Sequence, residues 1–211
     1  MTNRRIAAAL FASFLAASLQ GCFEAAVIGV GAGVVSAVDR RTTGAQVEDE
    51  GIELRAANRI RERFGDKAHI NVTSYNRSVL LTGETTDARA RDEIAKIVNG
   101  LQNVRGVSNE IQIAGISAYS ARASDSTITG KVKARFVDAN RFNALHVKVV
   151  TEAGVVYLMG IVTEKEAAEA TRLASTTGGV RKVVKVFEYC KLSDEACRPH
   201  ERPKGGDSKV R

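Results

Sequence analysis

Two segments of about 65 residues repeat one order of motifs, and this repeat constrains the fold more than any other feature. Each copy holds two Val- and Leu-rich runs, and the second run ends at a glycine, Gly83 in one copy and Gly160 in the other. These glycines lie 77 residues apart, while Val107 and Val183, which close the copies, lie 76 apart. The chain is therefore predicted to contain two copies of one supersecondary unit.

Each copy is predicted to fold as helix, strand, strand, helix and strand. The first helix of each copy carries apolar residues at four-residue spacing, which indicates a buried stripe: Ile52, Ala56, Ile60 and Phe64, then Ile128, Val132 and Phe136. Asp125 or Ser126 is expected to cap the second of these helices. Turns are predicted at 75–77 and 152–154, and second helices at 86–99 and 163–175. Two helices on one face of a three-stranded mixed sheet make each copy a two-layer α+β unit with the order αββαβ.

The two copies are assigned to residues 48–115 and 123–189, with a short stretch of small and polar residues between them. Residues 190–211 are charged and lack apolar periodicity, so they are expected to form a tail outside both cores.

The N-terminus resembles a bacterial lipoprotein signal. Arg4 and Arg5 precede an apolar run that is too short to span a bilayer but suits a secretory signal. The run ends at Leu19-Gln20-Gly21-Cys22, which is similar to a lipobox, where the Cys is acylated and becomes the first mature residue. We therefore expect a signal peptide at 1–21, a lipid on Cys22 and a flexible tether at 22–47. An ordinary signal peptide with an incidental Cys is the alternative.

Two further cysteines, Cys190 and Cys197, lie in the tail. An even pair in an exported protein suggests an intramolecular disulfide. A metal site that also uses His200 is the alternative, but its spacing is irregular and a fourth ligand is missing. The pair is accordingly predicted to form a disulfide and no metal site.

The motifs of both copies resemble the BON domain family. In the first copy these motifs are Ile70-Asn71-Val72-Thr73 with Val79-Leu80-Leu81-Thr82-Gly83; in the second they are Leu158-Met159-Gly160 with Val162-Thr163-Glu164. Together with the lipobox, the resemblance implies a dual-BON lipoprotein anchored in the outer membrane and facing the periplasm. It also implies that the second BON domain binds anionic phospholipid and that the protein supports envelope integrity. Phe23 after the lipidated Cys points the same way, because it is not the Asp that retains lipoproteins in the inner membrane.

Basic residues are concentrated in the second copy. Residues 48–118 carry ten basic and eleven acidic side chains, whereas residues 119–188 carry eleven basic and seven acidic ones. Four of these cations lie on or just after the first helix of the second copy: Lys131, Lys133, Arg135 and Arg141. A cationic element on a membrane-tethered protein favours contact with anionic head groups. An ordinary solvated helix face is the alternative.

The helical periodicity predicts which side of this helix touches lipid. With its stripe on the sheet, the opposite face presents small residues between cationic edges: Thr127, Gly130, Ala134 and Val137, flanked by Lys131 and Lys133. The family leads us to expect an interfacial aromatic near the start of this helix, yet position 127 is Thr and the chain has no Trp. Phe142 and Leu145 are candidate replacements for that anchor.

The sequence does not favour catalysis. His69 and His146 occupy equivalent repeat positions, which fits a structural role at a strand edge, and no nucleophile, phosphate loop or carboxylate set has the required context. Neither a cofactor nor a metal is expected. Nucleic acid is not expected as a partner, because aromatic stacking residues are scarce. The main alternative function is an envelope scaffold that binds proteins or peptidoglycan through its BON surfaces.

Overall fold

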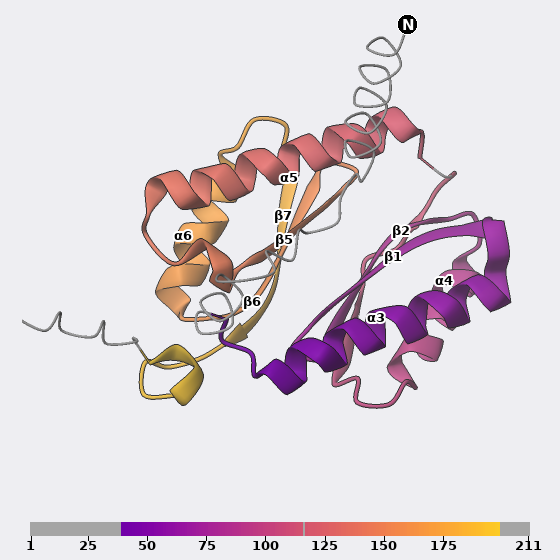
Figure 1. Cartoon of the computed structure of the whole chain (residues 1–211). Helices are drawn as coiled ribbons and strands as arrows, with labels where there is room; N and C mark the ends of the chain where they lie inside the picture. The colour runs from indigo at the N-terminus through magenta and orange to yellow at the C-terminus, as the bar shows by residue number, and fades with distance from the viewer. Residues whose placement is uncertain (1–38, 116, 199–211) are drawn as a thin grey trace, which may run out of the picture. The chain divides into compact units, whose positions relative to one another are not determined.

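The computed structural model describes residues 39–115 and 117–198 (Figure 1). Cys22, the predicted signal peptide, most of the predicted tether and His200 therefore lie outside the described residues.

The first copy forms one domain that begins with a long helix and a β-hairpin. Its elements are α3 (Thr43–Phe64), the 3-10 turn η1 (Gly65–Lys67), β1 (Ala68–Tyr75), β2 (Ser78–Thr85), α4 (Ala88–Asn99), β3 (Gly106–Asn109) and β4 (Gln112–Ile113). The strand β2 lies at the centre, antiparallel to β1 and parallel to β3 and β4. The predicted third strand is thus divided into two short segments, with an Asx turn between them in which Ile111 N–H donates to Asn109 Oδ1 at 3.3 Å.

The second copy repeats this arrangement. Its elements are α5 (Tyr119–Ala139), the 3-10 turn η2 (Ala144–His146), β5 (Lys148–Glu152), β6 (Val155–Val162), α6 (Glu164–Ser175) and β7 (Lys182–Tyr189), followed by η3 (Glu195–Cys197). Here β6 is central, antiparallel to β5 and parallel to β7. Thr163 and Glu166 form a capping box that starts α6 where the sequence predicts it.

Both first helices begin earlier than predicted. The helix α3 starts at Thr43, inside the expected tether, with the Thr42 hydroxyl accepting from Ala45 N–H at 3.1 Å. The helix α5 starts at Tyr119, inside the expected linker. The prediction that Asp125 or Ser126 caps α5 is therefore wrong, because both residues lie within the helix. The polar first turns of both helices precede their apolar stripes and so leave no periodic signal.

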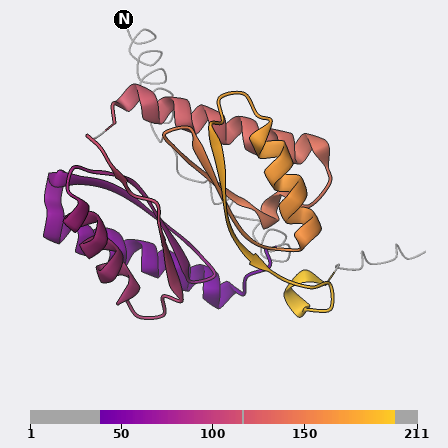
Figure 2. The same ribbon diagram turned by 180° about the vertical axis from the view of Figure 1, so that it is seen from behind.

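Each domain has a hydrophobic core between its helices and one face of its sheet. Figures 1 and 2 show α5 and α6 along one face of the sheet formed by β5, β6 and β7. The predicted stripe residues Ile52, Ala56 and Ile60 are buried in the first core, as are Ile128, Val132 and Phe136 in the second. This arrangement confirms the two-layer α+β unit in both copies.

The other faces of the two sheets share a third cluster, to which the second domain contributes most of the apolar side chains. Among the residues that the structure describes, the first domain supplies Tyr75 and Leu80 to this cluster, whereas the second supplies Val150, Val155, Tyr157, Met159, Ile161, Val184 and Val186. Polar contacts surround the cluster, including one from Asn76 Nδ2 to Glu188 Oε2 at 2.8 Å. The two domains therefore pack through unlike sheet faces.

Cys190 and Cys197 are joined by a disulfide in the structure. The expectation that this link lies beyond both cores needs correction, because Cys197 is only 1% exposed and packs into the third cluster. The short loop that the disulfide closes is thus part of the packed structure.

Candidate functional site

The helix α5 presents the face that the periodicity predicts. Because its apolar stripe is buried against the sheet, the opposite side is solvent-exposed over three turns. Six predicted contact residues within the helix are exposed: Thr127, Gly130, Lys131, Lys133, Ala134 and Val137. Arg141, just beyond the helix, is exposed as well. We call these seven residues the α5 surface.

The cations of the α5 surface are available for an external partner. Within residues 39–115 and 117–198, no ion pair involves Lys131, Lys133 or Arg141. The acidic residue Asp138 lies between Lys133 and Arg141 in the sequence, and its side chain is exposed. The surface also carries an apolar side chain, Val137, which is 65% exposed.

Arg135 does not belong to this surface. Its Nη1 donates to the carbonyl oxygen of Leu173 at 2.9 Å and to Thr177 Oγ1 at 3.0 Å. These acceptors lie at the C-terminal end of α6, where backbone carbonyls lack intrahelical partners. Arg135 therefore joins the two helices of the domain, and we leave it out of the α5 surface because its Nη1 is engaged there.

Of the two candidate anchors after α5, the structure leaves one exposed. Phe142 packs edge-on against the buried Phe136, with ring centroids 5.1 Å apart, and contributes to the core. Leu145 is 56% exposed. The exposed apolar contact available beside the α5 surface is accordingly Leu145.

A second polar feature fastens the N-terminal end of the described chain to the second domain. Arg40 pairs with both carboxylate oxygens of Glu166, at 2.6 and 3.0 Å, and donates to the carbonyl oxygen of Ile161 at 2.9 Å. His146 Nδ1 lies 3.3 Å from the same carboxylate. Burial by itself raises the pKa of Glu166, but the hydrogen bonds from His146 and Arg40 outweigh it and hold the pKa well below its usual range.

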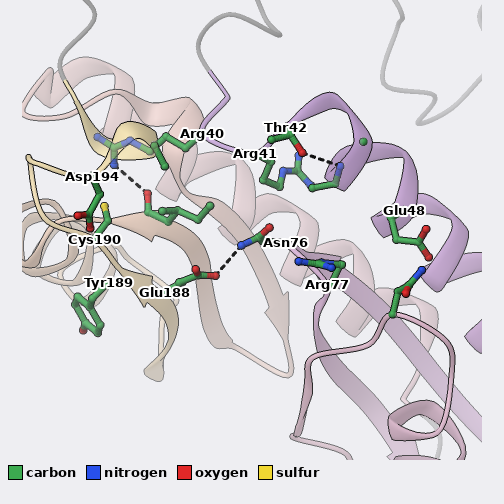
Figure 3. A pocket seen from close by; sticks show the side chains of 15 residues that line it. Arg40, Arg41, Thr42, Glu48, Asn76, Arg77, Glu188, Tyr189, Cys190 and Asp194 are labelled. Carbon is green, nitrogen blue, oxygen red and sulfur yellow. Dashed lines mark hydrogen bonds between the residues drawn. The ribbon is translucent and has the colours of Figure 1, made fainter.

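The pocket beside Arg40 has a volume of about 590 Å³ and a lining of mixed charge (Figure 3). Much of this charge is already paired. Arg41 bonds Asp39 and Asp49, at 2.8 and 2.9 Å, and stacks over the Tyr75 ring at 4.3 Å. The pocket therefore contributes to packing between the domains more clearly than to ligand binding.

The described part of the chain contains no group of three His, Cys, Asp or Glu side chains arranged to hold a metal ion. His146 lies in η2, before its strand, and is engaged with Glu166; His69 lies on β1. None of the described helices has the length and apolarity needed to cross a bilayer.

Comparison with known proteins identifies the family. The BON domain family matches this chain twice, over residues 49–115 and 124–191. The chain belongs to the BON domain family. It is also 38% identical over 174 residues to the outer membrane lipoprotein DolP of Haemophilus influenzae, an alignment that covers 81% of this chain and 90% of that protein.

Two further BON relatives are more distant. A 21 kDa hemolysin of Actinobacillus pleuropneumoniae is 34% identical, over 72% of this chain and 79% of its own length. The osmotically-inducible protein Y of Escherichia coli is 28% identical, over 54% of this chain and 58% of its own length.

Both BON domains contain a buried Asp that holds the hairpin turn, which the sequence reasoning missed. Asp125 accepts from Ala153 N–H at 2.9 Å and from Gly154 N–H at 2.8 Å. Asp49 accepts from Asn76 N–H at 2.8 Å and from Arg77 N–H at 2.7 Å. A signal was available, because each Asp lies three residues before the first apolar residue of its stripe in both copies.

Proposed function

We propose that this chain is an outer-membrane lipoprotein, tethered through acylated Cys22, that binds anionic phospholipid through the α5 surface of its second BON domain. In this role it supports the integrity of the envelope and carries out no catalysis. The observation that carries the proposal is that Lys131 and Lys133 on the exposed face of α5, and Arg141 just beyond the helix, form no ion pairs within the described residues.

Electrostatics supports this assignment in sign and size. Each basic residue near an anionic membrane surface contributes about 1 kcal/mol of attraction, which falls off within a Debye length. Three such residues on one element therefore supply a useful but reversible affinity. The first helix of the other domain is more mixed, since Arg55 pairs with Glu48 at 2.6 Å and Arg63 with Glu93 at 2.9 Å.

Small side chains on the α5 surface let the helix backbone approach the head groups. An alanine Cβ at Gly130 would meet nothing within 4 Å, so the helix has open space at this point. Val137 and Leu145 are the apolar groups able to enter the interface beside it. An aromatic anchor is missing at Thr127, so we expect the affinity of the isolated domains to be modest.

The lipid anchor supplies the persistent attachment. One acyl chain gives only marginal membrane binding, so stable anchoring requires two signals, and a diacylated and N-acylated Cys22 meets this need. Mass spectrometry of the mature N-terminus tests this part of the proposal. An unmodified Cys22, or cleavage at another bond, would contradict it.

Vesicle binding tests the recognition of lipid. The fragment 38–211 contains both hydrophobic cores, so it separates recognition from anchoring. We expect it to cosediment with phosphatidylglycerol vesicles and not to bind phosphatidylcholine vesicles. Added salt should release the bound fragment, because salt screens exposed charges.

Charge reversal then locates the site. The variant Lys131→Glu/Lys133→Glu/Arg141→Glu should bind anionic vesicles at least about tenfold more weakly, because three attractions of about 1 kcal/mol each become repulsions. Arg135 is left unchanged in this variant because it joins α5 to α6. The matched control is Arg59→Glu/Arg61→Glu/Lys67→Glu on the first domain, where all three side chains are exposed.

The outcomes separate the candidate functions. If only the triple variant of the α5 surface binds vesicles more weakly, the α5 surface is the membrane-binding site. If both triple variants bind equally weakly, binding reflects overall charge and the proposed site is wrong. No binding to either vesicle favours the alternative, an envelope scaffold that uses its BON surfaces to bind proteins or peptidoglycan.

A further inference from the structure

Two acidic side chains from different domains are buried in the same junction. Glu84, on β2, and Glu152, at the end of β5, are each only 4% exposed. Asn71 of the first domain donates from Nδ2 to Glu152 Oε2 at 2.8 Å, which fixes the second carboxylate against the first domain. No described group bonds the buried Oε2 of Glu84.

The strand register shows that these carboxylates share one contact zone. Asn71 on β1 is the partner of Thr82 on β2, and Glu84 is the next residue of β2 that points to the same side. The side chain that bonds Glu152 therefore lies next to Glu84. Thr82 is also fully buried there, and its hydroxyl has no partner among the described residues.

The surroundings of the two carboxylates hold little compensating positive charge. His69 on β1, Asp125 on α5 and Tyr157 on β6 lie close enough to Glu152 to interact with it electrostatically. Arg122 of α5 and Glu152 line one pocket of about 440 Å³, but the Nη2 of Arg122 is directed to the carbonyl oxygen of Ser117 at 3.1 Å. Asp125 already accepts two backbone N–H groups of the hairpin turn.

Burying two carboxylates in one interface costs free energy when both are ionised, because each loses hydration and the charges repel. Separating the domains returns both groups to water and removes this cost. We propose that proton uptake by Glu152, whose carboxylate shares this contact zone with Glu84, controls how tightly the two BON domains dock. This inference stands independently of lipid binding by the α5 surface.

The direction of the pH dependence follows from the shift at Glu152. Burial raises the pKa of Glu152, Asn71 opposes the shift, and the charges of Glu84 and Asp125 add to it. The docked state thus holds the proton more tightly than the separated state. Docking is strongest below the usual range of a glutamate and weakens as pH rises through the raised pKa, by up to about tenfold per pH unit for one proton within that window.

Distances between the domains report the effect directly. Spin labels at Asn58→Cys and Lys165→Cys, both exposed, place one label on each domain of residues 38–211, where the native cysteines are disulfide-bonded. We expect a single narrow distance at about pH 5 and an added broad component at about pH 8, because deprotonation weakens docking. Glu84→Gln and Glu152→Gln should keep the narrow distance at both pH values.

Three results would overturn the proposal: an unchanged wild-type distance between the two pH values, a full pH response in both Gln variants, or loss of the response in His69→Gln alone. The exposed Glu62→Gln serves as the matched control and should respond as the wild type does. Circular dichroism at both pH values separates undocking from unfolding, because undocked domains keep their secondary structure.

Discussion

Asp49 and Asp125 hold the same place in the two BON domains, 76 residues apart, and each buried carboxylate accepts two backbone N–H groups from the β-hairpin of its own domain. The turn residues need this support. Asn76, Arg77 and Ala153 all adopt positive φ, as a type I′ turn requires, although Arg and Ala carry a Cβ that disfavours it. The first helix thus fixes the turn of the hairpin on which it packs.

Replacing Asp125 by Ala should therefore destabilise the second domain. Hydrogen bonds to a charged group contribute about 1.5–3 kcal/mol each, so we expect the free energy of unfolding to fall by about 3 kcal/mol in urea titrations. Asp138→Ala, at an exposed position of the same helix, is the control and should change stability little. Equal losses in the two variants would show that Asp125 has no special role.

Gly160 and Gly130 should respond to Ala in opposite directions. A Cβ at Gly160 would collide with the carbonyl oxygen of His146, so Gly160→Ala must displace backbone and should cost at least about 2 kcal/mol. Gly130→Ala meets open space on α5 and should stabilise the helix by about 0.8–1 kcal/mol. Thermal unfolding of both variants checks the pair, and a tolerated Gly160→Ala would argue against the close strand contact.

Acid should remove the contribution of Glu166. Its pKa lies below the usual range, so the stabilisation is present above the unfolded pKa of a glutamate and is lost as pH falls through the folded pKa. Glu166→Gln should thus lower the melting temperature at neutral pH, with a difference that shrinks in acid. Glu164→Gln, exposed in the same first turn, should show a smaller effect; a constant Glu166→Gln difference across pH would contradict the prediction.

Loss of the disulfide should weaken the fold but not lipid binding. Closing so short a loop stabilises by about 2–3 kcal/mol on the chain-entropy model, so Cys190→Ala/Cys197→Ala should unfold at lower urea. Vesicle binding should persist because the α5 surface does not include this loop. Leu192→Ala, exposed in the same loop, controls for local changes, and reduced vesicle binding by the double variant would place the loop in the lipid site.

Restoring an aromatic residue should strengthen membrane contact. Thr127→Trp adds an interfacial side chain on the α5 surface, and partial burial of its ring should raise vesicle affinity several-fold, or about 1 kcal/mol. Asn58→Trp on the exposed side of α3 provides the comparison. Equal gains from both variants would mean that any exposed Trp binds the vesicles, irrespective of the helix.

The sequence predicts the parts of this fold that have a period. The stripes of α3 and α5, both hairpin turns and the helix that begins after Thr163 follow from spacing and turn chemistry. Helix starts at Thr43 and Tyr119 do not, because their first turns pack too little apolar surface to leave a pattern.

The candidate site, like the fold, can be predicted only where helical periodicity determines it. A helical wheel separates the exposed face of α5 from its buried stripe, but it cannot show that Arg135 reaches the end of α6 or that Phe142 folds back on Phe136. Those contacts join segments distant in sequence, as does the packing of Cys197 between the sheets. Long-range partners of this kind are fixed by the tertiary structure and leave no local spacing.

The unlike sheet faces give the order of the two copies a meaning. Within the described residues, the first domain contributes two apolar side chains to the third cluster, Tyr75 and Leu80, so this face exposes little apolar surface when the domain is alone. The second turns Tyr157, Met159 and Ile161 there, a surface that would invite aggregation if left bare. Since domains generally fold as units from the N-terminal end, the apolar sheet forms when its cover already exists. In a chain with the two copies exchanged, the apolar sheet would fold first and stay exposed until the other domain formed. The two repeats are therefore not interchangeable in order.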